Sequence, residues 1–155
     1  NVDLIVTTGG VSAGAYEVVK DALSGDVEFV KVAMQPGMPQ GAGTVGGTPI
    51  VTLPGNPVSA LVSFEVFIRP PLRATMGLPS QRPRRSATLT EKLTSPAGKR
   101  QFRRGVLGTD EQVSSYGPPA SHHLRWLATA NCLLDIGEDV VELAAGSPVP
   151  VWDLS

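Results

Sequence analysis

Two glycine-bearing corners constrain the fold of this chain most strongly, because each follows a strand-like run and precedes a helix-like one. The apolar run Val2–Thr8 ends at Gly9-Gly10, and the run Ile50–Leu53 ends at Pro54-Gly55-Asn56-Pro57. Strands that alternate with helices favour right-handed crossovers and a mostly parallel sheet. The carboxyl ends of parallel strands share one edge of the sheet, so both corners should lie there. The sequence thus predicts an α/β fold with a mostly parallel sheet and flanking helices.

The other patterns of the first half are those of one further strand, two helices and a loop. Apolar positions at helical spacing predict helices over Ala15–Leu23 and over residues 58 to 76, with two consecutive prolines interrupting the second helix near Arg69. Alternating polarity predicts a strand over Val27–Ala33. The stretch Gln35–Gly47 carries five Gly and two Pro, a composition typical of a loop.

Short strands separated by turns predict a β-rich second half. A polar, proline-containing linker over 77–85 precedes it. The expected strands are Ser86–Leu93, Phe102–Leu107, Gln112–Tyr116, Asn131–Ile136 and Val149–Trp152, with a short helix over Ser121–Thr129. We therefore expect an α/β unit over 1–76 and a small β-barrel or sandwich over 86–155.

Composition and charge exclude several functional classes. The chain has 13 Lys+Arg against 14 Asp+Glu, so its formal net charge of -1 provides no long-range attraction for nucleic acid or an anionic membrane. Its single cysteine, Cys132, permits no intramolecular disulfide and fits a reducing cytoplasm. No apolar run approaches the roughly 20 residues that span a bilayer. Because the chain opens inside a strand-like run without an initiator Met, we expect it to be a piece of a longer polypeptide.

The corner over 7–14 has the composition of an anion-binding loop. Free backbone N–H groups and the positive end of the following helix can hold a phosphate, and glycine lets the backbone approach it closely. A tight turn without a ligand is the equally consistent alternative, since Gly is common in any strained turn. The corner over 54–57 lacks two N–H donors at its prolines, so it shapes a wall more than it binds, or simply initiates a helix.

Four strings, in their order and spacing, resemble the C-terminal half of the molybdopterin molybdenumtransferase family, which includes the gephyrin E domain. They are Thr8-Gly9-Gly10-Val11-Ser12-x-Gly14, Pro36-Gly37-x-Pro39, Leu53-Pro54-Gly55-Asn56-Pro57-Val58-Ser59-Ala60 and Phe102-x-Arg104-Gly105-Val106-Leu107. The resemblance implies transfer of molybdenum from molybdate to adenylylated molybdopterin, with Mg²⁺ and with release of AMP. It also implies a molybdopterin-binding α/β domain over 1–76, truncated at its start, and a C-terminal β-barrel over 86–155.

The implied partners are small-molecule substrates, further domains of the same polypeptide and a second subunit of a homodimer that completes the active-site cleft. Neither nucleic acid nor a membrane is implied. A related paralogue that binds molybdopterin without catalysis, or acts as a scaffold, is the alternative function.

Carried over position by position, the resemblance assigns cofactor binding to the two corners and catalysis to three charged residues. The cofactor-binding positions are Gly9, Gly10, Val11, Ser12, Gly14, Pro54, Gly55, Asn56, Pro57 and Ser121. The catalytic positions are Glu17, Lys31 and Arg104, and Glu17 is also the metal position. From the residues alone, Glu17 is equally consistent with a solvated group in the first turn of a helix, and Lys31 with a surface side chain.

One departure from the family pattern bears on activity. Relatives commonly carry Lys on both sides of the Pro-Gly pair, where this chain has Gln35 and Met38. A charge about 4 Å from an oxyanion contributes about 4 kcal/mol at an effective dielectric near 20, before desolvation. The loss of two such charges favours weaker molybdate binding, or the non-catalytic alternative. His122-His123 has no further ligands at metal spacing, so it is a weaker metal candidate.

Overall fold

The structure of the chain is a computed structural model that describes residues 2–11, 18–117 and 124–155. Its first half forms a sheet with the strand order β1-β5-β4-β2. The strands are β1 (Ile5–Thr8), β2 (Val27–Lys31), β4 (Pro39–Val45) and β5 (Thr48–Leu53). Strand β1 is parallel to β5, whereas β4 pairs antiparallel with both β5 and β2. The sheet is therefore mixed, and the expectation of a mostly parallel sheet is wrong.

A tight hairpin accounts for the antiparallel pairing of β4 with β5. Val45 lies opposite Thr48, so the turn between them is Gly46-Gly47, whose φ angles are 57° and 84°. A two-residue hairpin turn of this kind needs left-handed backbone at both positions, which glycine adopts without strain. The hairpin returns the chain directly, so no crossover helix is needed between these strands.

The glycine-rich stretch over 35–47 is mostly strand, so its prediction as a loop is wrong. A Cβ at Gly43 would overlap the carbonyl oxygen of Asp26, and one at Gly41 would overlap the side chains of Thr52 and Phe29. Glycine within a strand commonly marks such a close approach of neighbouring chain. Composition alone therefore predicted a loop for a segment that forms strand β4, whose glycines allow neighbouring chain to pack closely.

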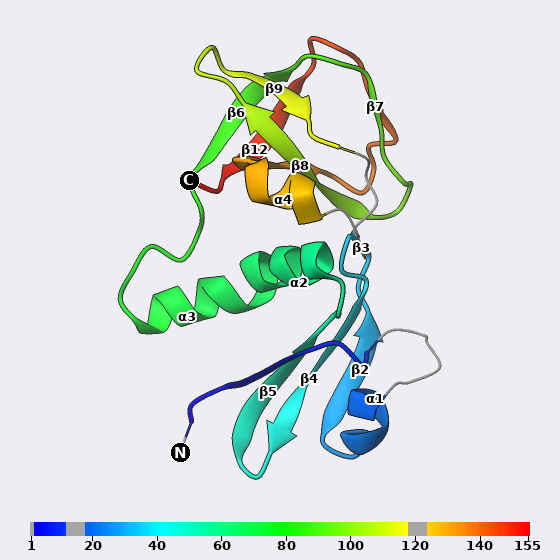
Figure 1. Cartoon of the computed structure of the whole chain (residues 1–155), viewed down its shortest axis with the longest axis vertical. Coiled ribbons are helices and arrows are strands. Elements are labelled where there is room, and N and C mark those ends of the chain that lie inside the picture. Colours follow the sequence, from blue (N-terminus) through cyan, green and yellow to red (C-terminus); the bar gives the residue numbers. More distant parts are fainter. Residues whose placement is uncertain (1, 12–17, 118–123) are drawn as a thin grey trace.

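One long helical run separates the sheet from the rest of the molecule (Figure 1). It consists of α2 (Pro57–Ser63), the π-helical turn η1 (Phe64–Ile68) and α3 (Arg69–Thr75). The expected interruption near Arg69 is confirmed, because the π-turn ends there and two prolines occupy the first turn of α3. A short helix, α1 (Val18–Ala22), follows the first glycine corner.

The second half is a closed five-stranded β-barrel, as expected. Its strands are β6 (Arg84–Leu89), β8 (Arg100–Leu107), β9 (Gln112–Ser115), β10 (Cys132–Ile136) and β12 (Pro148–Asp153). The order β10-β12-β6-β9-β8 closes on itself because β10 also pairs with β8. The short strands β7 (Leu93–Thr94) and β11 (Glu142–Leu143) pair beside it, and α4 (Leu124–Thr129) precedes β10.

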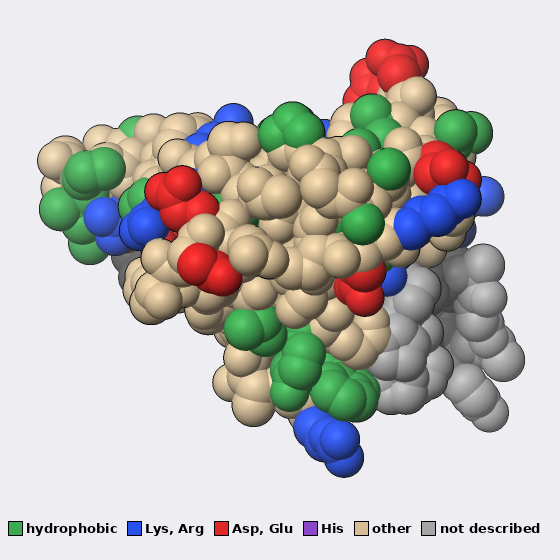
Figure 2. Space-filling view, turned by 90° about the horizontal axis from the view of Figure 1, so that it is seen from above, with side chains coloured by type: hydrophobic (Ala, Val, Ile, Leu, Met, Phe, Trp, Pro, Cys, Tyr) green, Lys and Arg blue, Asp and Glu red, His purple; other side chains and the backbone are tan. Residues whose placement is uncertain are grey.

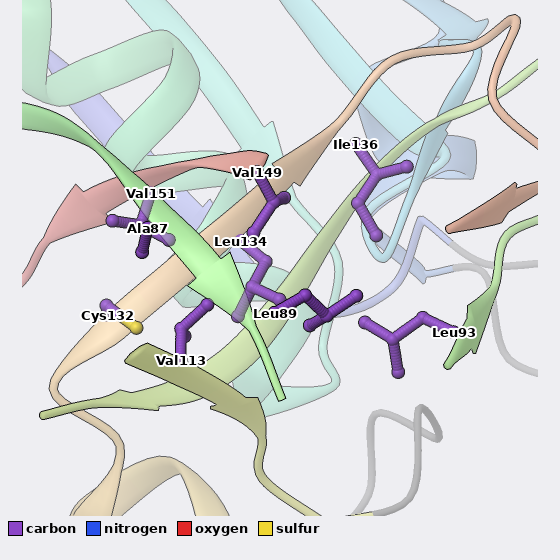
Figure 3. Close-up of a cluster of buried hydrophobic side chains, with 9 residues drawn as sticks. All are labelled: Ala87, Leu89, Leu93, Val113, Cys132, Leu134, Ile136, Val149 and Val151. Carbon is purple, nitrogen blue, oxygen red and sulfur yellow. The ribbon is translucent and has the colours of Figure 1, made fainter. Parts of the chain in front are cut away.

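Apolar side chains from β6, β9, β10 and β12 fill the interior of the barrel (Figure 3). The fully buried members include Leu89, Val113, Leu134, Val149 and Val151. Alternation along each strand sends these residues inward, which is the pattern that a small filled barrel requires. Packed apolar side chains therefore occupy the centre of the barrel.

The two halves are joined by a strand and by a second core. Strand β3 (Met34–Gln35) leaves the first half and pairs in parallel with β8 of the barrel. Residues of both halves share one buried cluster: Met34, Val58, Val62, Phe102, Leu133 and Trp152. The placement of α2 against the outer face of β8 and β10 follows from this shared core.

Charged groups of both signs are interspersed on the face seen in Figure 2, with no single-sign patch there. No helix in the described part of the chain is both long and apolar enough to traverse a bilayer.

Candidate anion-binding site

The two glycine corners lie side by side at one end of the β1–β5 pair. The amide of Gly9 donates to the carbonyl oxygen of Leu53 at 3.0 Å, and Thr8 is in register with Leu53. A Cβ at Gly55 would lie 2.9 Å from the Cα of Gly9, so the two backbones touch. The prediction that both corners share one edge is confirmed. Parallel pairing of β1 with β5 brings this about, although the rest of the sheet is antiparallel.

Left-handed backbone shapes the first corner. Gly9 and Gly10 have φ angles of 95° and 70°, which other L-residues rarely adopt. The carbonyl oxygen of Gly10 accepts from the amide of Lys20, which ties the corner to α1, and Val11 is buried. The described part of this corner is therefore shaped by its two glycines and tied to α1 by a backbone hydrogen bond.

The second corner begins α2 through an Asn cap. Asn56 Oδ1 accepts from the amides of Val58 at 3.1 Å and Ser59 at 3.4 Å, and Pro57 occupies the first helical position. Such a cap satisfies N–H groups that the helix leaves unpaired, and the fixed φ of proline suits the position. The cap consumes donors of the first turn, so this corner offers a rigid wall, as its prolines predict.

Arg104 lies in a pocket formed by both halves of the molecule. The pocket is lined by Gln35, Pro36 and Val58 of the first half, and by residues 101–104 and 115–117 of the barrel. Arg104 is only 5% exposed, and burial lowers the pKa of its guanidinium. A buried guanidinium suits an oxyanion, because its planar fork donates two parallel hydrogen bonds. Val58, which directly follows the second corner, lines this pocket together with Arg104.

An amide pair closes the pocket where the family pattern has lysine. Gln101 Nε2 donates to Gln35 Oε1 at 2.8 Å, across the paired strands β8 and β3. Gln101 is 3% exposed, and its Oε1 has no hydrogen-bond partner among the described residues. The exposed Met38 follows two residues after Pro36. The local electrostatics at Gln35 are therefore neutral, so the positive charge comes from the barrel side.

Arg103 faces the barrel side of the same pocket. Its Nη2 donates to Ser115 Oγ at 3.0 Å and its Nη1 to the carbonyl oxygen of Thr94 at 3.3 Å. Burial lowers the pKa of Arg103, and the neighbouring Arg104 lowers it further, although Glu91 opposes this. Two adjacent arginines of one strand thus border a single pocket.

The remaining predicted residues are not brought together by the described structure. Lys31 ends β2 and is exposed at the same end of the sheet, but β4 lies between β2 and β5. Ser12, Gly14, Glu17 and Ser121 lie outside the described residues, as do His122 and His123. Their assigned roles remain predictions.

The described residues do not provide a metal centre of their own. Within residues 2–11, 18–117 and 124–155, no group of three or more His, Cys, Asp or Glu side chains could hold a metal ion. The described corners present backbone amides and prolines, whereas Mg²⁺ prefers carboxylate, carbonyl and phosphate oxygens. The described part of the site therefore fits an anion better than a cation.

Sequence reasoning missed the pocket residues outside the four strings. These are Gln101, Ser115, Tyr116 and Gly117. Gln101 directly precedes the Phe102-x-Arg104 string, and this adjacency was the available signal for it. Ser115 and Tyr116 reach the pocket because β9 pairs with β8, a contact that no local pattern predicts.

Family models match both halves of the chain. The model described as a probable molybdopterin binding domain matches residues 1–74, and the model described as MoeA C-terminal region (domain IV) matches residues 86–154. The fold and the site thus define a molybdopterin-binding domain followed by a domain IV barrel. The chain belongs to the molybdopterin molybdenumtransferase family.

Individual relatives agree with this assignment. Molybdopterin molybdenumtransferase 2 of Mycobacterium tuberculosis is 74% identical, with 99% of this chain and 40% of that protein covered. Molybdopterin molybdenumtransferase of Haemophilus influenzae is 34% identical, with 96% of this chain and 39% of that protein covered. The crystal structure of a molybdopterin biosynthesis MoeA protein from Pyrococcus horikoshii matches with a TM-score of 0.80 and 26% identity, over 99% of this chain and 37% of that one. The chain thus spans about 40% of the length of the curated relatives that it matches.

Proposed function

We propose that the whole protein transfers molybdenum from molybdate to adenylylated molybdopterin and releases AMP, as part of molybdenum cofactor biosynthesis. The names of the relatives support this activity. The observation that carries the proposal is the meeting of two glycine corners beside a pocket that holds a buried arginine. Backbone amides at the start of a helix suit a pterin phosphate, and a guanidinium fork suits a tetrahedral oxyanion.

In this proposal each half of the chain has its own role in binding. The α/β domain over 1–76 binds molybdopterin through the loop at 9–14 and the corner at 54–57, with Lys31 at the rim. The predicted linker from residue 77 leads to the barrel, whose first strand already begins at Arg84 and which contributes Arg104 and Ser121 to the molybdate pocket. Catalysis is then mostly positioning and charge stabilisation, because the pocket holds donors in place before the anion arrives.

Arg104 has the central role. Its burial disfavours the charged guanidinium, and an anion that enters the pocket favours that charged form in a region of low dielectric. Arg103 adds positive potential from the neighbouring position. The neutral Gln35 contributes at most a hydrogen bond.

Magnesium enters this proposal through Glu17 alone. Mg²⁺ in nucleotide sites is commonly held by one or two carboxylates together with substrate phosphates. Glu17 would provide a carboxylate to hold Mg²⁺ together with the substrate phosphates, and the ion would neutralise phosphate charge.

A non-catalytic, molybdopterin-binding or scaffolding role is the second candidate. The specific observation in its favour is the neutral amide pair of Gln35 and Gln101 in the pocket. Under either candidate we propose small-molecule ligands, a cytoplasmic location, a homodimer that completes the cleft, and neither nucleic acid nor a membrane as partner.

The test is molybdate-dependent AMP release by the whole protein, measured with adenylylated molybdopterin. Arg104→Lys should raise the KM for molybdate about 10- to 100-fold, the range expected when one or two charge-assisted hydrogen bonds are lost. The matched control is Arg85→Lys, because Arg85 is an exposed arginine of the same barrel. Wild-type protein that binds molybdopterin but releases no AMP with molybdate would support the non-catalytic candidate instead.

A further inference from the structure

The segment between α3 and the barrel is bound along its length by arginines of the helical run. Arg69 Nη1 donates to the carbonyl oxygen of Ser80 at 3.1 Å, and Arg73 Nε donates to that of Pro79 at 2.7 Å. The amide of Leu78 donates to the carbonyl oxygen of Arg73 at 2.9 Å. The segment predicted as a linker is thus a strap that lies against the helix.

Arg82 ties this strap to two other parts of the chain. Its Nε and Nη2 each donate to one carboxylate oxygen of Glu65, both at 3.0 Å, which is the bidentate fork geometry. Its Nη1 donates to the carbonyl oxygen of Leu154 at 3.3 Å, just beyond the last barrel strand. The hydrogen bond to Glu65 raises the pKa of Arg82. One guanidinium therefore connects the helical run, the strap and the end of the barrel.

Glu65 is buried, so this contact is different in kind from a surface ion pair. Glu65 is 4% exposed and lies in the π-turn η1, with Arg69 Nε at 3.5 Å from the same carboxylate. Opening the strap would leave this buried carboxylate with only the longer contact to Arg69, which is unfavourable, so burial of Glu65 favours the closed strap. By contrast, the Arg85–Asp153 pair also reaches the end of the barrel, but its arginine is 57% exposed.

The shape of the anion pocket depends on how the two halves are held. Val58 of α2 and Arg104 of β8 line it from opposite halves. Leu154, whose carbonyl oxygen Arg82 binds, packs against the shared core that includes Val58. A rotation of the barrel about β3 would therefore move Arg104 relative to the corner at 54–57.

We propose that Arg82 is a positioning residue, which through its fork on Glu65 fixes the barrel, and with it Arg104, against the first turn of α2. Arg82 itself does not touch the ligand in this arrangement. The ligand-binding part of the test rests on the proposed function, whereas the part on strap closure does not.

The first measurement is amide hydrogen exchange at Leu78 and Leu154, whose N–H groups donate to Arg73 and Asn131. Arg82→Lys keeps the charge but cannot form the fork, so exchange at both amides should rise at least ten-fold. Arg85→Met, which removes an exposed ion pair, should leave both amides within two-fold of wild type. Unchanged exchange in Arg82→Lys would overturn the proposal.

The second measurement separates positioning from stability. The double variant Glu65→Met/Arg82→Met removes both charges and keeps apolar volume, so it should fold while lacking the fork. In the whole protein we expect its KM for molybdate to rise at least five-fold with kcat within two-fold of wild type. A variant that only lost stability would instead lower the apparent kcat and leave KM unchanged, which contradicts the proposal, as would wild-type values for both. If wild-type protein shows no molybdate dependence, the proposed function fails, and the exchange measurement still decides the role of Arg82.

Discussion

The backbone of Gly55 touches that of Gly9, so closely that a Cβ at Gly55 would lie 2.9 Å from the Cα of Gly9. These glycines are far apart in the sequence and end two parallel strands. The contact leaves no room for a side chain at Gly55. The anion-binding region therefore depends on glycine at position 55 for steric reasons.

We expect Gly55→Ala to push the corners apart. Overpacking of this kind typically costs about 1 to 3 kcal/mol in the free energy of unfolding. Chemical denaturation measures this loss, and calorimetry should show weaker binding of molybdopterin. Gly25→Ala is the matched control, since nothing lies within 4 Å of a Cβ at Gly25. Equal stability of the two variants would contradict the steric argument.

Asn56→Asp should separate helix capping from anion binding. Aspartate accepts the same hydrogen bonds from Val58 and Ser59, so thermal stability should stay close to wild type. Its negative charge should nevertheless weaken molybdate binding, and this weakening should shrink as salt is added. Asn56→Ala, by comparison, should lose about 1 kcal/mol of stability because the cap is removed. Tighter molybdate binding by Asn56→Asp is the result that would remove this corner from the site.

Gln35→Lys should tighten molybdate binding. A lysine adds a positive charge to the pocket at the cost of the hydrogen bond from Gln101, and we expect a net gain of about ten-fold, well below the unscreened Coulomb energy. Isothermal titration with molybdate at two salt concentrations checks both the gain and its electrostatic origin. Gln35→Met is the neutral control, and it should bind no tighter than wild type. A gain that does not depend on salt would point to another cause.

Asp135→Asn should destabilise the junction between the barrel and the shared core. The Asp135 carboxylate accepts from Arg100 at 2.7 and 2.6 Å and from Trp152 Nε1 at 2.9 Å. Asparagine would leave the donors of Arg100 and Trp152 incompletely paired, which should lower the free energy of unfolding by about 2 to 4 kcal/mol. Urea denaturation followed by tryptophan fluorescence measures the change. Asp139→Asn, at an exposed position, should stay within about 0.5 kcal/mol of wild type.

Cys132 should make stability fall at high pH. Burial raises the pKa of its thiol from 9.0 to about 12, so the folded state keeps a proton that the unfolded state releases. The contribution is fully present below about pH 9 and is lost as the pH rises from about 9 towards 12. Denaturation curves at pH 7, 9 and 10.5 measure this loss. In Cys132→Ala the same decline should be shallower, and an identical decline in both proteins would mean that other groups cause it.

The local features of the helical run were predictable because each follows from the chemistry of a few adjacent residues. The Asn56 cap, the proline at the start of α2 and the interruption before Arg69 need no distant partner. The sequence predicted a small β-barrel or sandwich, and the structure has a closed barrel. Its closure depends on pairing between β8 and β10, which are distant in the sequence. Its short strand β3 was missed, because two residues carry too little pattern to indicate a strand.

The mixed sheet was not predictable for a specific reason. Glycines such as Gly41 and Gly43 are typical of loops, but these two lie in β4, at positions where the neighbouring chain leaves no space for a Cβ. Only the folded arrangement reveals that crowding. Once β4 is a strand, the Gly46-Gly47 turn makes an antiparallel hairpin, and the prediction of a mostly parallel sheet fails.

By itself, the sequence determined the local corners, the family and the residue types available for binding an anion, because these depend on adjacent residues and their order. Only the tertiary structure decided that Gly9 meets Gly55, that Arg104 shares a pocket with Val58, and that Gln101 pairs with Gln35. The physical reason is that these contacts arise from strand pairing and from a core shared by two halves of the chain. Such long-range packing depends on the whole set of buried side chains, and no short stretch of sequence encodes it.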